Sequence, residues 1–192
     1  MPKNYTRFKT TNWYVVTGAP SSGKTTVLNG LRKMGFLIYP ETARFLIDKE
    51  IKKGKKIGEI RKNEAEFQEK IFKMKLAREK ATSEDKTVFF DRGIPDSLAY
   101  YKVAGLNWKK IYKYCNEKRY KKVFFLEKLL YKKDYARTEN VHSVKIISNL
   151  LKKNYRSLGY KLIIIPVASP SRRVGMILKK IKGDQATHKF KR

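Results

Sequence analysis

The sequence predicts a three-layer α/β domain built on a five-stranded parallel sheet. Five short segments are apolar throughout, and amphipathic segments of helical length separate them. Strands that are apolar on both faces are typical of a parallel sheet with helices on each side. The chain has 192 residues, which is enough for one domain with its own core. We therefore expect a single domain over residues 1–192, with a core over about 12–182 and basic tails at both ends.

Strands are expected where short apolar runs meet turn signals. The first run leads directly into a glycine-rich turn, and the second ends at Pro40. The third is followed by a turn that contains Gly93 and Pro95. The five expected strands are 12–17, 36–39, 87–90, 122–126 and 161–167.

Helices are expected in the longer segments between these strands. Gly54 and Gly58 separate the second expected helix from the third, and residues 134–139 are expected to form a polar loop. Residues before Thr11 and after Lys182 carry little apolar periodicity, so we expect these tails to fray. The seven expected helices are 23–34, 41–53, 59–80, 96–103, 108–116, 141–155 and 171–181.

The composition excludes several classes of protein. Cys115 is the single cysteine, which excludes an internal disulfide and a cysteine-built zinc site. His142 and His188 are the two histidines, so a histidine-based metal site is not expected. No apolar run approaches the roughly 18 residues that a membrane helix needs, and residues 1–10 show no apolar segment behind a charged start. We expect a cytoplasmic protein without a membrane partner.

The charge is strongly positive. Lys and Arg number 46 against 17 Asp and Glu, giving a formal net charge of +29. Two interpretations remain open. The surface could bind nucleic acid or another polyanion through its phosphates. Alternatively, the excess reflects a lysine-rich proteome, because phosphate recognition by paired hydrogen bonds favours Arg over Lys.

Residues 18–25 match the phosphate-loop pattern G-x-x-x-x-G-K-[ST] between the first strand and the first helix. Glycines allow backbone N–H groups to surround a phosphate, Lys24 reaches the outer phosphates, and the Thr25 hydroxyl ligates Mg²⁺. A glycine-rich turn with an incidental lysine is the alternative. The sequence therefore predicts a site for a nucleoside triphosphate with Mg²⁺. The expected nucleotide contacts are Gly18, Ala19, Ser21, Ser22, Gly23, Lys24, Thr25 and Thr26.

Charged residues also follow two other expected strands. Ligands of open α/β sheets bind at the carboxyl edge of the strands, where Asp91 and Arg92 lie after the third strand and Glu41 after the second. Asp91 is expected to hold Mg²⁺ together with Thr25, and Arg92 to bind an anionic or hydroxyl-bearing acceptor. Glu41 is placed to accept a proton from an attacking hydroxyl. We expect its strand to lie beside the phosphate-loop strand.

Each of these residues also has a structural interpretation. Asp91 could be a turn residue, Arg92 a member of a structural ion pair, and Glu41 a residue favoured at a helix start by the helix dipole. Asp96 could cap the next helix. Arg44, one turn after Glu41 on the same face, could be an ordinary surface arginine.

The set of motifs resembles the NadR-like P-loop family, which includes the ribosylnicotinamide kinase domain of bacterial NAD regulators. The resemblance spans about residues 12–182 and implies a kinase-like three-layer fold with ATP as the donor. As in the similar deoxynucleoside kinases, it implies Glu41 as the base, Asp91 as the acid near magnesium and Arg92 as an acceptor contact. The motifs are G-A-P-S-S-G-K-T-T from Gly18, Pro40–Arg44, Phe90–Gly93 with Asp96 and Tyr100, Asp134–Arg137, and Ile165–Val167 with Arg172–Val174.

Kinase-like P-loop proteins also cover the phosphates with a lid that brings an arginine to the transferring group. By its position Arg137 is expected to be that arginine, with Lys132 and Lys133 as possible assistants or as a solvated pair. Arg172 and Arg173 follow the last strand, where such folds place adenine, and one of them is expected to stack on the base.

Three functions fit these features. The first is an Mg²⁺-ATP-dependent kinase that acts on a hydroxyl of a small nucleoside-like acceptor. The second is a polynucleotide or RNA kinase or ATPase that docks through the basic surface. The third is a regulatory NTPase. No N-K-x-D-like motif follows Leu126, so a GTPase is not favoured.

Overall fold

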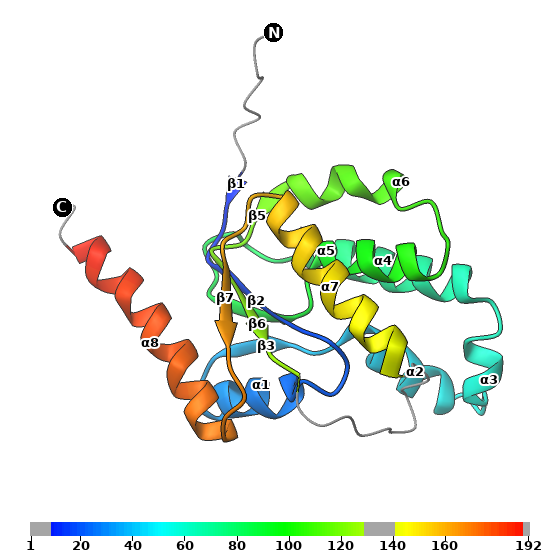
Figure 1. The fold of residues 1–192 in the computed structure, drawn as a ribbon, viewed down its shortest axis with the longest axis horizontal. Coiled ribbons are helices and arrows are strands. Elements are labelled where there is room, and N and C mark those ends of the chain that lie inside the picture. Colours follow the sequence, from blue (N-terminus) through cyan, green and yellow to red (C-terminus); the bar gives the residue numbers. More distant parts are fainter. Residues whose placement is uncertain (1–8, 129–140, 190–192) are drawn as a thin grey trace, which may run out of the picture.

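The computed structural model describes residues 9–128 and 141–189, and it places five parallel strands between two layers of helices (Figure 1). The strands are β2 (Trp13–Thr17), β3 (Leu37–Tyr39), β4 (Val88–Asp91), β6 (Lys122–Leu126) and β7 (Leu162–Ile165). Their order across the sheet is β3–β4–β2–β6–β7, and every neighbouring pair is parallel. The predicted three-layer α/β fold with a five-stranded parallel sheet is confirmed.

The two faces of the sheet pack against different helices. Tyr14 and Val16 belong to a core with α1 (Lys24–Lys33) and α8 (Pro170–Lys189). Trp13 and Val15 point to the opposite layer, as successive residues of a strand do. No helix within residues 9–128 and 141–189 is long and apolar enough to cross a membrane. The opposite layer contains α4 (Glu64–Lys80), α5 (Ile94–Val103) and α7 (Val141–Ser157).

Smaller elements complete the described part of the chain. The helices α2 (Thr42–Ile51) and α3 (Ile57–Ile60) follow β3. The helix α6 (Lys109–Tyr112) runs into a 3₁₀ turn, η1 (Lys113–Asn116). A second, two-stranded sheet pairs β1 (Lys9–Thr10) with β5 (Lys118–Arg119).

The position of β4 corrects the predicted strand order. Strand β4 lies between β3 and β2, so the prediction that the strand before Glu41 lies beside the phosphate-loop strand is wrong. All four side chains of β4 are buried, whereas Leu37 of β3 is 36% exposed. The more apolar strand therefore takes the inner place, and β3 takes the edge. Both strands still end at the same edge of the sheet.

Several element boundaries also differ from the prediction. The helix expected over 59–80 is interrupted, because Asn63 Oδ1 accepts a hydrogen bond from the Glu66 amide at 3.1 Å and starts α4 there. Strand β7 ends before Pro166, which has no N–H to continue the ladder. Helix α8 continues to Lys189, beyond the tail predicted after Lys182. The polar loop predicted at 134–139 lies outside the described residues.

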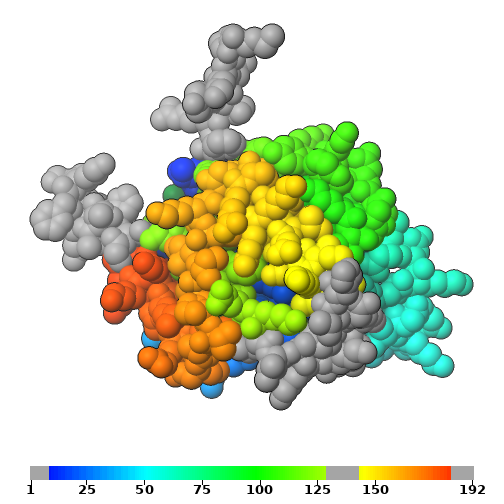
Figure 2. Space-filling model, viewed as in Figure 1, coloured from blue at the N-terminus to red at the C-terminus, as the bar shows by residue number. Residues whose placement is uncertain are grey.

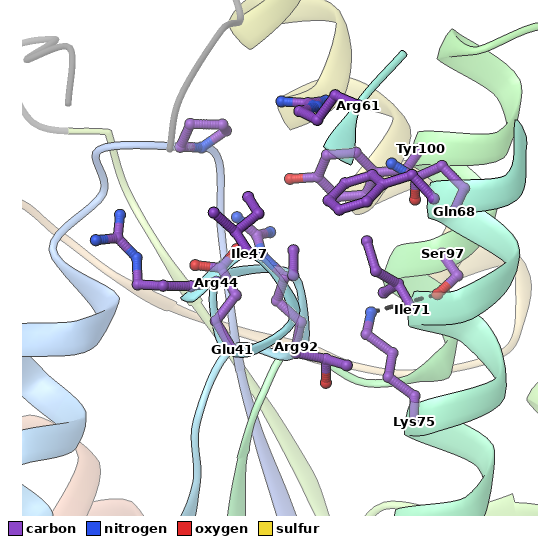
Figure 3. Close-up of a pocket in the computed structure, with 14 residues that line it drawn as sticks. Glu41, Arg44, Ile47, Arg61, Gln68, Ile71, Lys75, Arg92, Ser97 and Tyr100 are labelled. Carbon is purple, nitrogen blue, oxygen red and sulfur yellow. Dashed lines mark hydrogen bonds and ion pairs between the residues drawn. The ribbon is translucent and has the colours of Figure 1, made fainter. Parts of the chain in front are cut away.

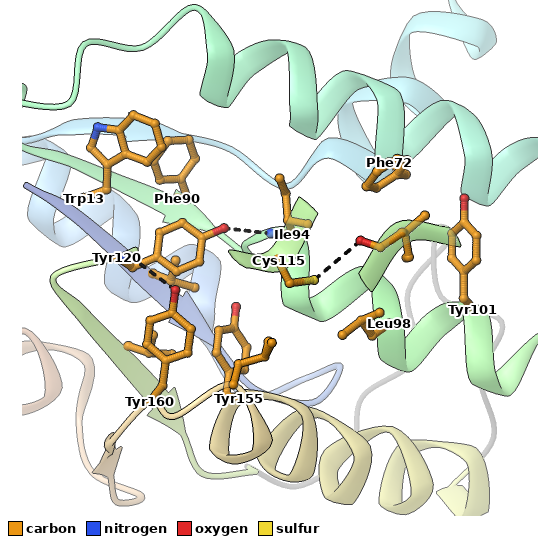
Figure 4. Close-up of a cluster of buried hydrophobic side chains, with 14 of the residues drawn as sticks. Trp13, Phe72, Phe90, Ile94, Leu98, Tyr101, Cys115, Tyr120, Tyr155 and Tyr160 are labelled. Carbon is orange, nitrogen blue, oxygen red and sulfur yellow. Dashed lines mark hydrogen bonds between the residues drawn. The ribbon is translucent and has the colours of Figure 1, made fainter. Parts of the chain in front are cut away.

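A buried carboxyl group lies in the helical layer that contains α4, α5 and α7, next to the cluster of buried side chains drawn in Figure 4. Glu79 of α4 is 5% exposed, and the Tyr120 hydroxyl donates to its Oε1 at 2.6 Å. Tyr120 in turn accepts a hydrogen bond from the Ile94 amide at 2.9 Å. Burial raises the pKa of Glu79 to about 7, against the opposing effects of the Tyr120 hydrogen bond and the Lys75 charge.

This raised pKa predicts a pH-dependent stability. Between the ordinary value of 4.5 and about 7 the native state holds a proton on Glu79 that the unfolded chain releases. The native state is therefore favoured at low pH, and this stabilisation is lost as the pH rises through about 7. The Glu79→Gln variant keeps the acceptor for Tyr120 without the charge. We expect wild type to lose on the order of 3 kcal/mol more stability than this variant between pH 4 and pH 8.5.

Urea unfolding at the two pH values measures this difference. Glu84→Gln is the matched control, because Glu84 is a carboxylate in contact with Lys9 and Lys118 near the surface. The control should show the same pH response as wild type. Equal pH responses of wild type and Glu79→Gln would contradict the prediction.

Candidate active site

The phosphate loop connects the end of β2 to the start of α1. Gly18 adopts φ 145°, and a Cβ there would lie 2.6 Å from the Leu126 carbonyl oxygen. The loop therefore needs a glycine where it passes the end of β6. Gly23, with φ 81°, stands directly before the first helical residue, Lys24. The strand–loop–helix arrangement predicted from the motif is present in the structure.

The Lys24 side chain is folded back over the loop. Its Nζ donates to the Gly18 carbonyl at 3.0 Å, the Ala19 carbonyl at 2.9 Å and the Ser22 hydroxyl at 3.2 Å. Burial lowers the pKa of Lys24 to about 8, and the Arg92 charge acts in the same direction. The ammonium is therefore held inside the loop by neutral oxygen atoms, where a phosphate would supply the missing negative charge.

Arg173 of α8 contacts the backbone of the phosphate loop and of the segments beside it. Its guanidinium donates to the carbonyls of Ser22 at 2.6 Å, Glu127 at 3.0 Å and Pro166 at 2.9 Å. Arg173 is 2% exposed, whereas Arg172 is exposed and its backbone N–H donates to Ser169 Oγ at 3.4 Å. The sequence indicated the arginine pair, but only the structure separates their positions. Stacking of Arg172 on adenine stays a prediction.

Asp91 and Thr25 line a common cavity at the carboxyl edge of the sheet. Asp91 is 3% exposed, and its Oδ1 has no hydrogen-bond partner among the described residues. Burial raises the pKa of Asp91 to about 7, and the Glu41 charge adds to this effect. An unpartnered buried carboxylate oxygen in the same cavity as a threonine fits the oxygen ligands that Mg²⁺ prefers. The two residues assigned to the metal from the sequence therefore suit it chemically.

Arg92 connects the phosphate loop to Glu41. Its Nε donates to Glu41 Oε1 at 2.9 Å, and its Nη1 donates to the Gly18 carbonyl at 3.0 Å and to Asp96 Oδ1 at 3.4 Å. The residue has φ 69°, a strained conformation for a non-glycine residue. Such strain is typical of residues that the surrounding structure holds for function. The structure therefore brings Glu41 and Arg92 together at the loop, although their strands end in different parts of the sequence.

The charge on Glu41 depends on this contact. Burial alone would raise the pKa of its carboxyl group, but the charges of Arg92 and Lys24 outweigh burial and lower the pKa to about 2. Glu41 is therefore an anion at neutral pH. Asp96 is fully buried behind this pair, where it accepts hydrogen bonds from the Gly93 amide at 2.9 Å and from Thr17 Oγ1 at 2.6 Å. Its contact with Gly93 at the start of α5 agrees with the capping role considered for it.

A second cavity opens on the other side of Glu41 (Figure 3). It lies among α2, α4 and α5, and Arg92 forms part of its wall. The Arg92 guanidinium carbon lies 5.3 Å from the centre of the Tyr100 ring. Helix α4 supplies one wall from positions that share a face at helical spacing. Those four residues are Phe67, Gln68, Ile71 and Lys75.

Sequence reasoning missed most of this second cavity. Gln68 and Lys75 occupy positions of α4 that continue the buried stripe of Phe67 and Ile71, and both are at least 94% buried. Polar residues on the buried face of an amphipathic helix are a signal of function that the sequence did contain. Ser97 completes the wall from α5. The lid residues Arg137, Lys132 and Lys133 lie outside the described residues, and their roles stay predictions.

Comparison with known proteins places this geometry in a family. A family model described as an AAA domain matches residues 13–173. The chain belongs to this family. No curated protein matches the sequence significantly.

Solved structures with the same fold include two kinases and the NadR protein. Deoxyadenosine kinase from M. mycoides, with products dCMP and dCDP bound, matches at a TM-score of 0.66 and 12% identity, over 89% of this chain and 99% of that one. NadR in complex with NR matches at a TM-score of 0.65 and 18% identity, over 90% of this chain and 49% of the NadR chain. Thymidylate kinase from Ehrlichia chaffeensis matches at a TM-score of 0.64 and 12% identity, over 88% of this chain and 97% of that one.

These matches confirm the resemblance to NadR-like P-loop proteins and the kinase-like fold. This AAA domain spans about half the length of the NadR chain. At identities of 12–18% the likeness shows the fold, and the chemistry of the site has to be argued from its own residues.

Proposed function

We propose that the protein is an Mg²⁺-ATP-dependent kinase that transfers a phosphoryl group to a hydroxyl of a small nucleoside-like acceptor. The observation that carries this proposal is the position of Glu41. Its carboxylate lines both cavities, the one with Thr25 and Asp91 and the one with Tyr100 and Gln68. A group shared by the expected phosphate-metal site and a second cavity is placed to act on a hydroxyl as it attacks the phosphate.

Each residue has a defined task in this reaction. The loop amides and Lys24 hold the phosphates, while Thr25 and Asp91 hold Mg²⁺, which neutralises charge on the phosphates when it is bound. Glu41 orients the acceptor hydroxyl and takes its proton. The bond from the acceptor oxygen to the γ-phosphorus forms as the bond to the leaving oxygen of ADP breaks. Arg92 keeps Glu41 ionised and oriented through the 2.9 Å contact.

The low pKa of Glu41 defines how it works. A carboxylate with a pKa of about 2 is a weak base, so early removal of the proton is not its contribution. In a loose phosphoryl-transfer transition state the attacking hydroxyl loses its proton late, and positioning of the nucleophile dominates. Glu41 is therefore assigned mainly to orientation, with proton acceptance following as the new bond forms.

The acceptor class is supported by the lining of the second cavity. Phe67 and Tyr100 offer aromatic surfaces, and the Gln68 side chain offers an amide beside them. Aromatic surfaces with a few convergent polar groups suit a planar heterocyclic ring. One fold neighbour, deoxyadenosine kinase, is described with the nucleotides dCMP and dCDP, and another, NadR, is described with NR. The proposal also assigns Arg137 to the transferring phosphoryl group and Arg172 to stacking on adenine.

Transfer of label tests the proposal directly. The full chain is incubated with Mg²⁺, γ-labelled ATP and a panel of ribo- and deoxyribonucleosides, and the products are separated by chromatography. We expect label on a nucleoside at a rate that exceeds ATP hydrolysis. Hydrolysis that no nucleoside diverts would instead support a regulatory NTPase.

A nucleic-acid substrate is the second candidate, because of the distribution of charge. Figure 2 shows a face on which α7, β7 and α8 lie forward. The exposed cations Lys153, Arg156 and Lys161, on and beside α7, form no ion pair within the described residues. In the same assay, label on an oligonucleotide end and a steep decline of binding with salt would support this candidate. Weak, sequence-independent binding without faster ATP turnover is the result we expect.

A further inference from the structure

Lys75 is a buried cation that the proposed transfer reaction does not use. It projects from α4 into the second cavity, and it is 6% exposed (Figure 3). Its Nζ donates to the Gly93 carbonyl at 3.2 Å and to Ser97 Oγ at 3.3 Å. Among the described residues, no carboxylate lies within 4.0 Å of Nζ, so Lys75 forms no ion pair there. The charges of Asp96, Glu41 and Glu79 act on the Lys75 ammonium from beyond ion-pair distance, but both of its hydrogen-bond partners are neutral. Burial of a charge without a directly paired countercharge is costly.

The hydrogen-bonding capacity of this wall is incomplete. A lysine ammonium has three N–H donors and no acceptor, and Lys75 uses two of them. Ser97 accepts from Lys75, and no acceptor for its own hydroxyl proton is found within residues 9–128 and 141–189. Lys75 and Ser97 therefore both present spare donors to the cavity. A ligand group that meets them has to be a hydrogen-bond acceptor.

The rest of the cavity indicates what carries that group. Phe67, Ile71 and Tyr100 offer flat or apolar surfaces around the same space, which suit a planar ring. Glu41 lines both cavities, Arg92 lines this one and contacts the Gly18 carbonyl of the phosphate loop, and Lys75 belongs to the wall built by α4. A ring whose sugar hydroxyl meets Glu41 would then turn one edge toward α4.

We propose that the acceptor carries a ring oxo group that Lys75 and Ser97 bind, and that these two residues select it over the corresponding amino compound. This inference rests on the proposed function, since it names the substrate class of that site. An exocyclic amino group offers no acceptor to the third N–H of Lys75. That buried charged donor would then stay unpaired, which is strongly disfavoured.

Matched nucleoside pairs test the selection. Uridine and inosine carry an oxo group where cytidine and adenosine carry an amino group. Binding of all four to the full chain is measured by calorimetry with a non-hydrolysable ATP analogue, and kcat and KM are measured with ATP. We expect wild type to favour the oxo member of at least one pair by about 10- to 100-fold, the range of a hydrogen bond to a charged group.

The Lys75→Met variant should reduce this preference to about threefold or less, as a change in Kd and KM with kcat little altered. Methionine keeps a chain of similar length without the donors. Lys73→Met is the matched control on the same helix, because Lys73 is largely exposed and lies 3.8 Å from Glu69. The control should keep the wild-type preference. Ser97→Ala is a second variant, which tests the inference even if Lys75→Met fails to fold. It should lower the oxo preference in part.

Three results would overturn the inference. The first is equal affinity within both pairs, or a preference for the amino members. The second is an oxo preference that survives in both Lys75→Met and Ser97→Ala, and the third is the absence of binding by all four nucleosides. Failure of the kinase proposal is a separate result. Oxo-selective binding that depends on Lys75, without label transfer, would reject the reaction and keep the substrate class. Label transfer without an oxo preference would keep the kinase reaction and reject the substrate class.

Discussion

The Lys24→Ala variant is expected to lose phosphoryl transfer almost completely. In the proposed reaction Lys24 supplies positive charge to the outer phosphates, and such charge stabilises the transition state of phosphoryl transfer directly. Removal of one well-placed electrostatic donor of this kind lowers kcat by about 10²–10³. We expect a loss at or beyond the upper end, because Lys24 also donates to the carbonyls of Gly18 and Ala19 and so organises the loop.

The fold should tolerate this change. Burial lowers the pKa of Lys24, which means that its charge is unfavourable in the free protein, and removal of the ammonium offsets the loss of its hydrogen bonds. Lys33→Ala is the control, because Lys33 is exposed at the opposite end of the same helix. Initial rates with labelled ATP and urea unfolding measure the two effects. Turnover near the wild-type rate in Lys24→Ala would reject the phosphate-loop assignment.

The Glu41→Gln variant is expected to lower acceptor phosphorylation by about 10²–10⁴, because it loses both the orientation of the acceptor hydroxyl and the late acceptance of its proton. Glutamine can still accept the hydrogen bond from Arg92 Nε, so the contact that links the two cavities survives. The property lost in the proposed reaction is the negative charge that holds the acceptor hydroxyl and takes its proton. ATP affinity should change little, because the proposed nucleotide contacts lie in the phosphate loop.

Two measurements separate this role from a structural one. The first is ATP affinity by calorimetry, and the second is kcat with a saturating acceptor. Glu84→Gln, a carboxylate in contact with Lys118 and away from both cavities, should match wild type in both. A parallel fall of ATP affinity and turnover in Glu41→Gln would instead place Glu41 among the groups that bind the metal or maintain the loop.

Local sequence patterns determined the elements and the nucleotide side of the candidate site. Continuous apolar runs and helical periodicity depend on neighbouring residues alone, so all five strands of the main sheet were predicted close to their observed bounds. The phosphate loop is likewise a contiguous motif, and Thr25, Asp91 and Glu41 were placed at one edge of the sheet because parallel strands end together. The contact between Glu41 and Arg92 joins two such strand ends.

Tertiary packing decided the strand order and the acceptor side. Hydrophobic periodicity shows that a strand is buried but not which strand lies beside it, so the insertion of β4 between β3 and β2 emerged only in the structure. Lys75 and Ser97 meet across two helices and 22 positions of sequence, and Arg173 reaches the phosphate loop across 151 positions. Such contacts have no local signature, because they depend on the packing of α4 on α5 and of α8 behind the loop. The amino-acid pattern therefore determined the phosphate-loop motif and the ligand expected there, and the packing of helices determined the shape and polarity of the cavity beside it.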